Sequence, residues 1–342
     1  MNSDLKAYFD TLCDGKYPKF IDKYLETLEL KRLDKVGMFC GCDYTGLFSP
    51  SFWYSRLDHS ISTALMTYHF TGDKLQTILA LFHDMGTPAF SHCVDFMLGD
   101  AKNQSKAEKS VKDIVMGSAN LKELLKKDRI PLDAFDDYES YPVVECSKPK
   151  ICVDRLDGVF SLNYILLNNF SIAQIKEVYK NMAVLKNEFG EEEIGFLNTE
   201  SAELFFDMAT KYALEMQGNE DKYVMQFIAD NLKLLIREGK ITHEDLYKLG
   251  EQEVLAIAKR INGSNIREFN FAKRLKRSDS PSDVWYSISV DAKKRYILPL
   301  VKVGNEAVRL HTISKKCKGM FDYFMSFNDS KWCFVPNIKP FA

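Results

Sequence analysis

The chain has 342 residues, of which 46% are hydrophobic and 27% charged, a composition that is typical of a globular protein and excludes disordered and fibrous chains. Its 46 basic and 48 acidic side chains leave a formal net charge of -2, which argues against nucleic acid as a partner bound through its backbone. Eight cysteines with one close pair, Cys40 and Cys42, do not form the framework of a disulfide-rich secreted protein. We expect mostly free, buried thiols, and ordinary packing rather than zinc at that pair.

The N-terminal segment Met1–Lys6 lacks the basic and then apolar pattern of a signal peptide. No apolar run approaches the roughly 20 residues that span a bilayer. We therefore expect a cytoplasmic protein without a membrane segment. A chain of this length is also expected to form either a large single core or a core with a smaller appended lobe.

Helical periodicity dominates most of the chain. Apolar residues recur at intervals of three and four, which predicts amphipathic helices and a mainly α fold. Four such stripes are Ile61, Ala64, Leu65 and Tyr68; Leu75, Ile78, Leu79 and Phe82; Ile228, Leu232, Leu235 and Ile236; and Leu246, Leu249, Val254, Ile257 and Ala258.

The C-terminal part has a different character. Val284–Val290 largely alternates apolar with polar residues, and Tyr296–Val303 is rich in strand formers, so a small sheet is predicted there. Lys276–Asp283 has the composition of a linker, and Glu191–Glu193 is typical of a solvated charge run at a loop or helix end.

The polar residues that suggest chemistry are His59, the pair His83-Asp84, and Asp154. The pair closes an apolar helix that Gly86 can end in the left-handed conformation and that Pro88 prevents from resuming. Imidazole and carboxylate groups are ligands for iron, manganese, zinc, nickel or magnesium. The alternative is a set of satisfied polar residues in a helical core.

Three segments carry a resemblance to a known family: Arg56-Leu57-Asp58-His59-Ser60, the run from His83 to His92, and Val153-Asp154-Arg155-Leu156-Asp157. In this order they resemble the HD-domain metal-dependent phosphohydrolase superfamily, and within it the deoxynucleoside triphosphate triphosphohydrolase branch. Lys294–Val301 is also similar to a stretch beyond the helical core of that branch. The resemblance implies an HD-domain helical core with the metal site in residues 1–240 and a smaller C-terminal α+β lobe in residues 241–342.

The resemblance also implies roles for single residues. His59, His83, Asp84 and Asp154 would hold one divalent metal ion (Mn, Fe, Ni, Zn or Mg). Arg56 and Arg155 would neutralise phosphate oxygens, and His92 would orient the phosphate beside the metal. Structural alternatives are that the two arginines pair with Asp58 and Asp157 and that His92 caps its helix. The implied partner is a small-molecule nucleotide or other phosphate ester, and a homo-oligomer is implied as well.

The sequence departs from the family pattern at several positions. Thr87 and Ala107 stand where the triphosphohydrolases have histidines linked to proton handling, and Gly158 and Leu162 replace a tyrosine and an aspartate that contact the sugar. Glu108, which follows Ala107, could equally be a surface carboxylate. Three hypotheses stay open: a dNTP triphosphohydrolase, an HD-type phosphomonoesterase or phosphodiesterase with the same site, and a non-catalytic nucleotide-binding protein.

Overall fold

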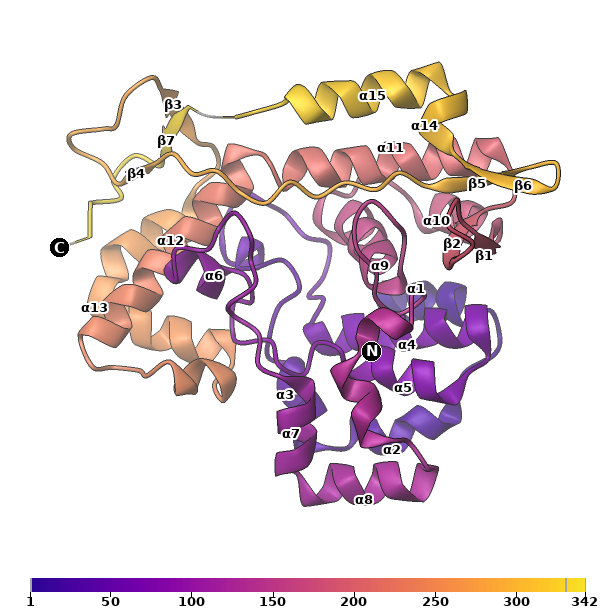
Figure 1. Ribbon diagram of the computed structural model, residues 1–342. Coiled ribbons are helices and arrows are strands. Elements are labelled where there is room, and N and C mark those ends of the chain that lie inside the picture. Colours follow the sequence, from indigo (N-terminus) through magenta and orange to yellow (C-terminus); the bar gives the residue numbers. More distant parts are fainter. Residues whose placement is uncertain (1, 330, 342) are drawn as a thin grey trace.

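A computed structural model describes residues 2–329 and 331–341. The protein is mainly helical with a smaller β component, as predicted (Figure 1). The helices are α1 Ser3–Cys13, α2 Asp22–Leu25, α3 Leu28–Leu33, α4 Arg56–Thr71, α5 Lys74–Phe82, α6 Cys93–Met97, α7 Val111–Gly117, α8 Ala119–Asp128, α9 Val153–Ser161, α10 Ile172–Tyr179, α11 Thr199–Glu215, α12 Asn219–Arg237, α13 Glu251–Phe271, α14 Leu310–Ile313 and α15 Lys315–Ser326. No helix in these two ranges is long and apolar enough to cross a membrane.

Helices α4 and α5 form the hairpin that carries the first two motifs. Ser55 and Asp58 form a capping box at the start of α4, and Gly72 ends it in the left-handed conformation. Asp73 then caps α5. The two predicted apolar stripes face each other and the core, so α5 delivers His83 to the interior directly after its last residue.

The predicted helix from Leu246 to Ala258 is wrong in its first part. Leu246 lies in a 3-10 turn, Glu244–Tyr247, and α13 begins only at Glu251. The carboxylate of Glu253 accepts a hydrogen bond from the backbone N–H of Gly250 at 2.7 Å, which fixes the start of the helix. The stripe at Ile228 to Ile236 lies on α12 as predicted.

Two sheets form where the sequence predicted one. A four-stranded sheet has the order β1-β2-β5-β6, and a three-stranded sheet has the order β3-β7-β4. The strands are β1 Met182–Lys186, β2 Glu192–Phe196, β3 Lys276–Ser278, β4 Ser287–Ile288, β5 Leu300–Val303, β6 Glu306–Arg309 and β7 Trp332–Phe334. Strand β2 pairs in parallel with β5, so one sheet joins segments on both sides of residue 240. The predicted division of the chain into residues 1–240 and 241–342 stays a prediction.

Three sequence predictions in the β regions need correction. Glu192 and Glu193 open strand β2, and Glu193 is 1% exposed because Arg309 of β6 pairs with it at 2.7 Å. Part of the predicted linker forms β3 in the three-stranded sheet. The predicted strands shrink to β4 and β5 because residues 284–286 and 289–299 belong to no strand.

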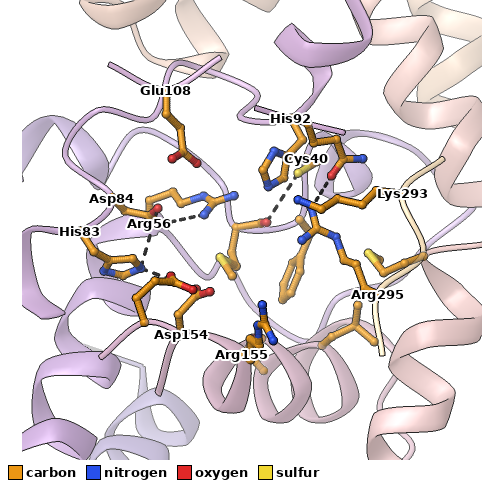
Figure 2. A pocket seen from close by; sticks show the side chains of 18 of the residues that line it. Cys40, Arg56, His83, Asp84, His92, Glu108, Asp154, Arg155, Lys293 and Arg295 are labelled. Carbon is orange, nitrogen blue, oxygen red and sulfur yellow. Dashed lines mark hydrogen bonds and ion pairs between the residues drawn. The ribbon is translucent and has the colours of Figure 1, made fainter. Parts of the chain in front are cut away.

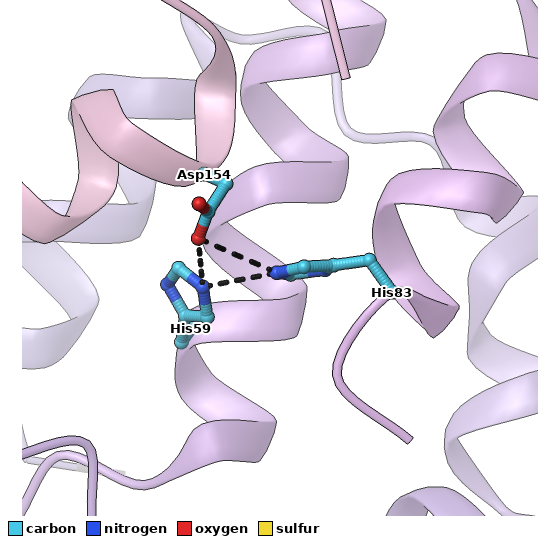
Figure 3. Close-up of side chains that lie close together, drawn as sticks. All are labelled: His59, His83 and Asp154. Carbon is cyan, nitrogen blue, oxygen red and sulfur yellow. Dashed lines mark hydrogen bonds and ion pairs between the residues drawn. The ribbon is translucent and has the colours of Figure 1, made fainter. Parts of the chain in front are cut away.

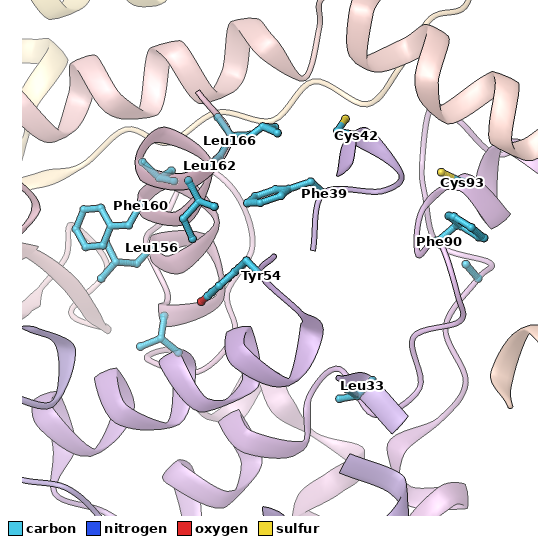
Figure 4. Close-up of a cluster of buried hydrophobic side chains, with 14 of the residues drawn as sticks. Leu33, Phe39, Cys42, Tyr54, Phe90, Cys93, Leu156, Phe160, Leu162 and Leu166 are labelled. Atoms are coloured by element: carbon cyan, nitrogen blue, oxygen red, sulfur yellow. The ribbon is translucent and has the colours of Figure 1, made fainter. Parts of the chain in front are cut away.

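The hydrophobic core reaches the polar site along α9 (Figure 4). Leu156, Phe160 and Leu162 from α9 and the π-helical turn Leu162–Leu166 that follows it are fully or nearly buried. Tyr54 is also buried, and its hydroxyl contacts the carboxylate of Asp157 at 3.0 Å. The apolar core therefore packs directly against the polar side chains around His59. All eight cysteines are free thiols.

Candidate active site

Three of the four predicted metal ligands converge on one point (Figure 3). The Nε2 atom of His59 lies 3.2 Å from Nε2 of His83 and 3.2 Å from Oδ1 of Asp154. Nε2 of His83 lies 3.6 Å from the same Asp154 oxygen. The three side chains come from the first turn of α4, the end of α5 and the first turn of α9, so residues 95 positions apart meet here.

The other ring nitrogens of both histidines are already engaged. Nδ1 of His59 donates to Oδ2 of Asp157 at 2.6 Å, and Nδ1 of His83 donates to the carbonyl oxygen of Ala80 at 2.6 Å. A carboxylate and a carbonyl oxygen can only accept, so each Nδ1 carries the proton and each Nε2 presents its lone pair. Two lone pairs and a carboxylate oxygen facing one another need a cation between them, and this donor set fits a divalent metal.

The pKa values of His59 and Asp154 in the metal-free protein reflect the short distances between these side chains. Burial lowers the pKa of His59, but hydrogen bonds with Asp154 and Asp157 outweigh burial and raise that pKa to about 10. Burial raises the pKa of Asp154, whereas His59 and His83 bring it well below its usual range. A proton therefore takes the place of the cation when none is bound.

Asp84 lies slightly farther from the centre. Its Oδ2 is 3.7 Å from Nε2 of His59, and its Oδ1 is 3.8 Å from Nε2 of His83. Arg56 donates to Oδ2 of Asp84 at 2.7 Å, and Thr87 donates to Oδ1 at 3.2 Å. Arg56 thus pairs with Asp84. It does not pair with Asp58, although the sequence left that pairing open as a structural alternative. The role of Asp84 as a ligand stays a prediction.

Arg155 and His92 line the same pocket (Figure 2). Arg155 donates to the carbonyl oxygen of Lys150 at 3.1 Å and does not pair with Asp157, which binds His59 instead. His92 precedes α6, but its side chain makes no capping hydrogen bond there. Its Nδ1 lies 3.0 Å from Oδ2 of Asp95. Burial lowers the pKa of His92 to about 4, so its ring is neutral near pH 7.

Gly86 does not adopt the left-handed conformation that the sequence predicted, since its φ is not positive. A β-carbon on Gly86 would lie 2.0 Å from the carbonyl oxygen of Lys109, so glycine is needed for a close backbone approach. The N–H of Lys109 donates to the carbonyl oxygen of Gly86 at 3.1 Å. This contact holds the segment that carries Ala107 and Glu108 against the turn that follows His83 and Asp84.

The pocket has a volume of about 600 Å³, which lies within the usual range for small-molecule sites. One end is formed by His83, Asp84 and Asp154, and the opposite end by Lys293 and Arg295 (Figure 2). Apolar side chains line its walls: Phe39, Leu162, Leu166, Met216 and Met225.

Glu108, which the sequence left open as either a site residue or a surface carboxylate, points into the pocket toward Arg56 (Figure 2). The sequence interpretation missed other pocket residues. Tyr212 of α11 lies over Gly158, with its hydroxyl 4.0 Å from the position of a β-carbon there, so it lies next to the position where the family has a tyrosine. Lys293 and Arg295 come from an irregular segment without periodicity, and only their charge could have indicated them. A second group of potential ligands, Glu145 and Cys152, shares Asp154 with the first.

Comparisons with known proteins complete the description. No model of a known protein family matches the chain. The chain is 23% identical over 269 residues to the uncharacterized protein YdhJ of Bacillus subtilis, across 78% of this chain and 80% of that protein. It is 27% identical over 133 residues to a protein of the fungus Cordyceps militaris named metal-dependent phosphohydrolase cns2, across 39% of this chain and 37% of the fungal protein.

A solved structure shares the fold across most of the chain. It is the crystal structure of a hypothetical protein from Aquifex aeolicus, with a TM-score of 0.61, 15% sequence identity and coverage of 91% of both chains. At this identity the likeness shows the fold alone.

Proposed function

We propose that the protein is a metal-dependent phosphohydrolase of the HD superfamily that acts on a small phosphate ester, with a nucleotide as the substrate class. The observation that carries the proposal is the convergence of His59 Nε2, His83 Nε2 and Asp154 Oδ1 at the end of a pocket that also holds Arg56 and Arg155. The name of the fungal relative, metal-dependent phosphohydrolase, supports the same activity.

In this proposal His59, His83 and Asp154, with Asp84 beside them, hold one divalent ion. When bound, such an ion supplies a water of lowered pKa and polarises a phosphoryl oxygen. Arg155 has no carboxylate partner in the described residues, so its guanidinium is free to donate to phosphate oxygens. Arg56 orients Asp84 through Nη1, donates through Nε to the hydroxyl of Ser91 at 3.1 Å, and lines the pocket.

Protonation of the leaving group needs a residue other than the absent histidines. Desolvation of the Glu108 carboxyl inside the pocket, and then the charge of Asp84, raise the pKa of Glu108 to about 7. Without a metal, Glu108 therefore holds a proton more readily than an ordinary glutamate, and we assign it the role of general acid because its side chain points into the pocket toward Arg56. A bound cation would lower this pKa, so the assignment rests first on the position of the side chain.

The reaction within this class has two candidates. A dNTP triphosphohydrolase is the simplest interpretation of the three motifs. Two residues favour a phosphomonoesterase. Thr87 stands where the family has a proton-handling histidine, and its hydroxyl donates to Asp84. Ala107 stands at the second such position, and its methyl group cannot transfer a proton.

The proposal is tested by elemental analysis of the purified protein, followed by assays of phosphate, pyrophosphate and tripolyphosphate release over a nucleotide panel. The double variant His83→Ala/Asp84→Ala should lose both stoichiometric metal and activity, while the exposed-site control His243→Ala should keep both. Full metal occupancy in the double variant would refute the site. Metal-loaded wild type that releases no phosphate product from any substrate would refute the activity.

A further inference from the structure

Two cations at the far end of the pocket form no ion pair with an acidic side chain of the described residues. Asp221 lines the same pocket but forms no ion pair with either of them. The guanidinium of Arg295 donates to the side-chain oxygen of Gln104, and Lys293 has no side-chain hydrogen bond or ion pair with a described residue. Both line the pocket opposite the side chains of His83 and Asp154 (Figure 2). We call Lys293 and Arg295 the distal cation pair.

The backbone holds this pair in place. The N–H of Lys293 donates to the carbonyl oxygen of Ala101 at 3.1 Å, and the side chain of Gln217 donates to the carbonyl oxygen of Lys293 at 2.9 Å. The intervening Lys294 does not line the pocket, and its ammonium group donates to the carbonyl oxygens of Met325 and Phe327 at 2.7 Å and 3.1 Å.

The charges of this region repel one another. Burial lowers the pKa of Lys293, and the positive charges of Arg295, Lys148 and Arg155 lower it further. A partly buried ammonium group near other cations, without a carboxylate within ion-pair distance among the described residues, is less favourable until an anion arrives. Lys293 and Arg295 thus bring two positive charges to the pocket without a carboxylate of the described residues in ion-pair contact, and this arrangement favours an anionic ligand.

We propose that the distal cation pair binds a second anionic group of the substrate, while the phosphoryl group to be cleaved lies at His59, His83 and Asp154. This inference rests on the proposed function and narrows it to phosphate esters that carry a further phosphate. The second phosphate belongs either to the same phosphate chain, as in a nucleoside diphosphate or triphosphate, or to the other end of a nucleoside, as in a bisphosphate. Apolar side chains that line the pocket, such as Phe39 and Leu162, can contact the organic part of either kind of substrate.

The experiment compares wild type with Lys293→Gln/Arg295→Gln and with the matched control Lys294→Gln, whose side chain lies outside the pocket. The substrates are p-nitrophenyl phosphate, AMP, ADP, ATP and adenosine 3′,5′-bisphosphate, each with metal-loaded protein. In the double variant, kcat/KM should fall roughly 10- to 100-fold more for substrates with a second phosphate than for p-nitrophenyl phosphate. The larger loss with ADP and ATP, or with the bisphosphate, identifies the source of the second phosphate.

An equal loss for all substrates, or the same selective loss in Lys294→Gln, would overturn the proposal. If wild type hydrolyses none of the five substrates, the proposed function fails separately, and calorimetric titration with pyrophosphate and with the bisphosphate still tests the pair. At least one of these anions should then bind at least tenfold more weakly to the double variant, and equal affinity overturns the inference. The single variant Lys293→Gln replaces the double variant if thermal melting shows that the latter is unfolded.

Discussion

Nδ1 of His59 donates to Oδ2 of Asp157 at 2.6 Å, and both side chains are fully buried. The same carboxylate accepts hydrogen bonds from the hydroxyls of Tyr8 at 2.6 Å and Tyr54 at 3.0 Å. Asp157 therefore fixes the tautomer of His59 and ties it to α1 and to the loop before α4. Such a partner behind a ligand histidine both orients the ring and increases its basicity.

The variant Asp157→Asn should weaken metal binding by roughly 10- to 100-fold, the range typical of this kind of partner. Asparagine can present its amide N–H to His59 and thereby favour the wrong tautomer. Competition with a chromophoric chelator measures the affinity. As a control, Tyr8→Phe keeps the carboxylate and its bond to His59 and should change the affinity less. Unchanged affinity in Asp157→Asn would show that His59 does not depend on this contact.

The second prediction concerns the close approach of Gly86 to Lys109. A methyl group in Gly86→Ala would overlap the backbone carbonyl oxygen of Lys109, so the segment with Glu108 has to move. We expect a loss of about 1 to 3 kcal/mol in unfolding free energy, as for overpacking of a filled interior, and reduced phosphohydrolase activity.

Chemical denaturation and activity assays check this prediction. The control Gly117→Ala adds a methyl group at the end of α7, where no atom lies within 4 Å, and should be neutral or slightly stabilising. If Gly86→Ala has the same unfolding free energy as wild type, the backbones of Gly86 and Lys109 can move apart without loss of stability.

The third prediction is a pH dependence of stability caused by Glu251. This side chain is fully buried, its Oε1 accepts from the backbone N–H of Phe90 at 2.9 Å, and the hydroxyl of Tyr44 and the backbone of Gly37 lie near the carboxyl group. Burial, and then the charge of Asp43, raise the pKa of Glu251 from 4.5 to about 8. The folded state thus binds the proton more tightly than the unfolded state.

Stability from this group is therefore fully present below pH 4.5 and is lost as the pH rises toward about 8. Between pH 6 and pH 9, the free energy of unfolding of wild type should fall more than that of Glu251→Gln. Below the pKa of the folded state, the difference grows by up to roughly 1.4 kcal/mol per pH unit. Melting temperatures of both proteins, with the exposed-site control Glu238→Gln, measure the difference. Parallel curves for wild type and Glu251→Gln would contradict the assignment. The affected region includes the turn at Phe90 and Ser91, with φ of 63° and 48°, which precedes His92.

The sequence predicted the helical class from its apolar stripes, and the same pattern placed His83 and Asp84 at the end of an apolar helix. The grouping of these two residues with His59 and Asp154 was implied by the resemblance of the three motifs to a known family, and the structure brings His59, His83 and Asp154 together. Local pattern did not place Gly86, since its need for glycine comes from Lys109 on a distant segment. Strand β2 was also missed: the charge of Glu193 conceals its burial, and only the pairing with Arg309 makes that burial favourable.

The distal cation pair could not be predicted for a similar reason. Residues 290–299 have no helical periodicity and pair with no strand, so nothing in the local sequence separates Lys293 from Lys294. The direction of each side chain follows from contacts with Ala101, Gln217 and Met325, which are far away in the chain. Tertiary contacts decide which of two adjacent lysines faces a substrate.

The last prediction concerns the two departures from the family pattern. Thr87 and Ala107 are both 1% exposed, and the N–H of Ala107 donates to Asp95, the partner of His92, at 2.9 Å. If these positions have lost the proton-handling histidines, wild type should hydrolyse nucleoside triphosphates slowly, because positioned acid or base groups contribute about 100- to 10,000-fold. The double variant Thr87→His/Ala107→His should raise the rate of tripolyphosphate release, provided that thermal melting shows it folded. Thr87→His alone should do little, since groups that act as a unit are not additive.

Rapid tripolyphosphate release by wild type would contradict this interpretation. Activity of wild type on monophosphates, together with a folded double variant that is inert on triphosphates, would favour the phosphomonoesterase. Inert proteins that bind nucleotides tightly by calorimetry would favour the non-catalytic hypothesis.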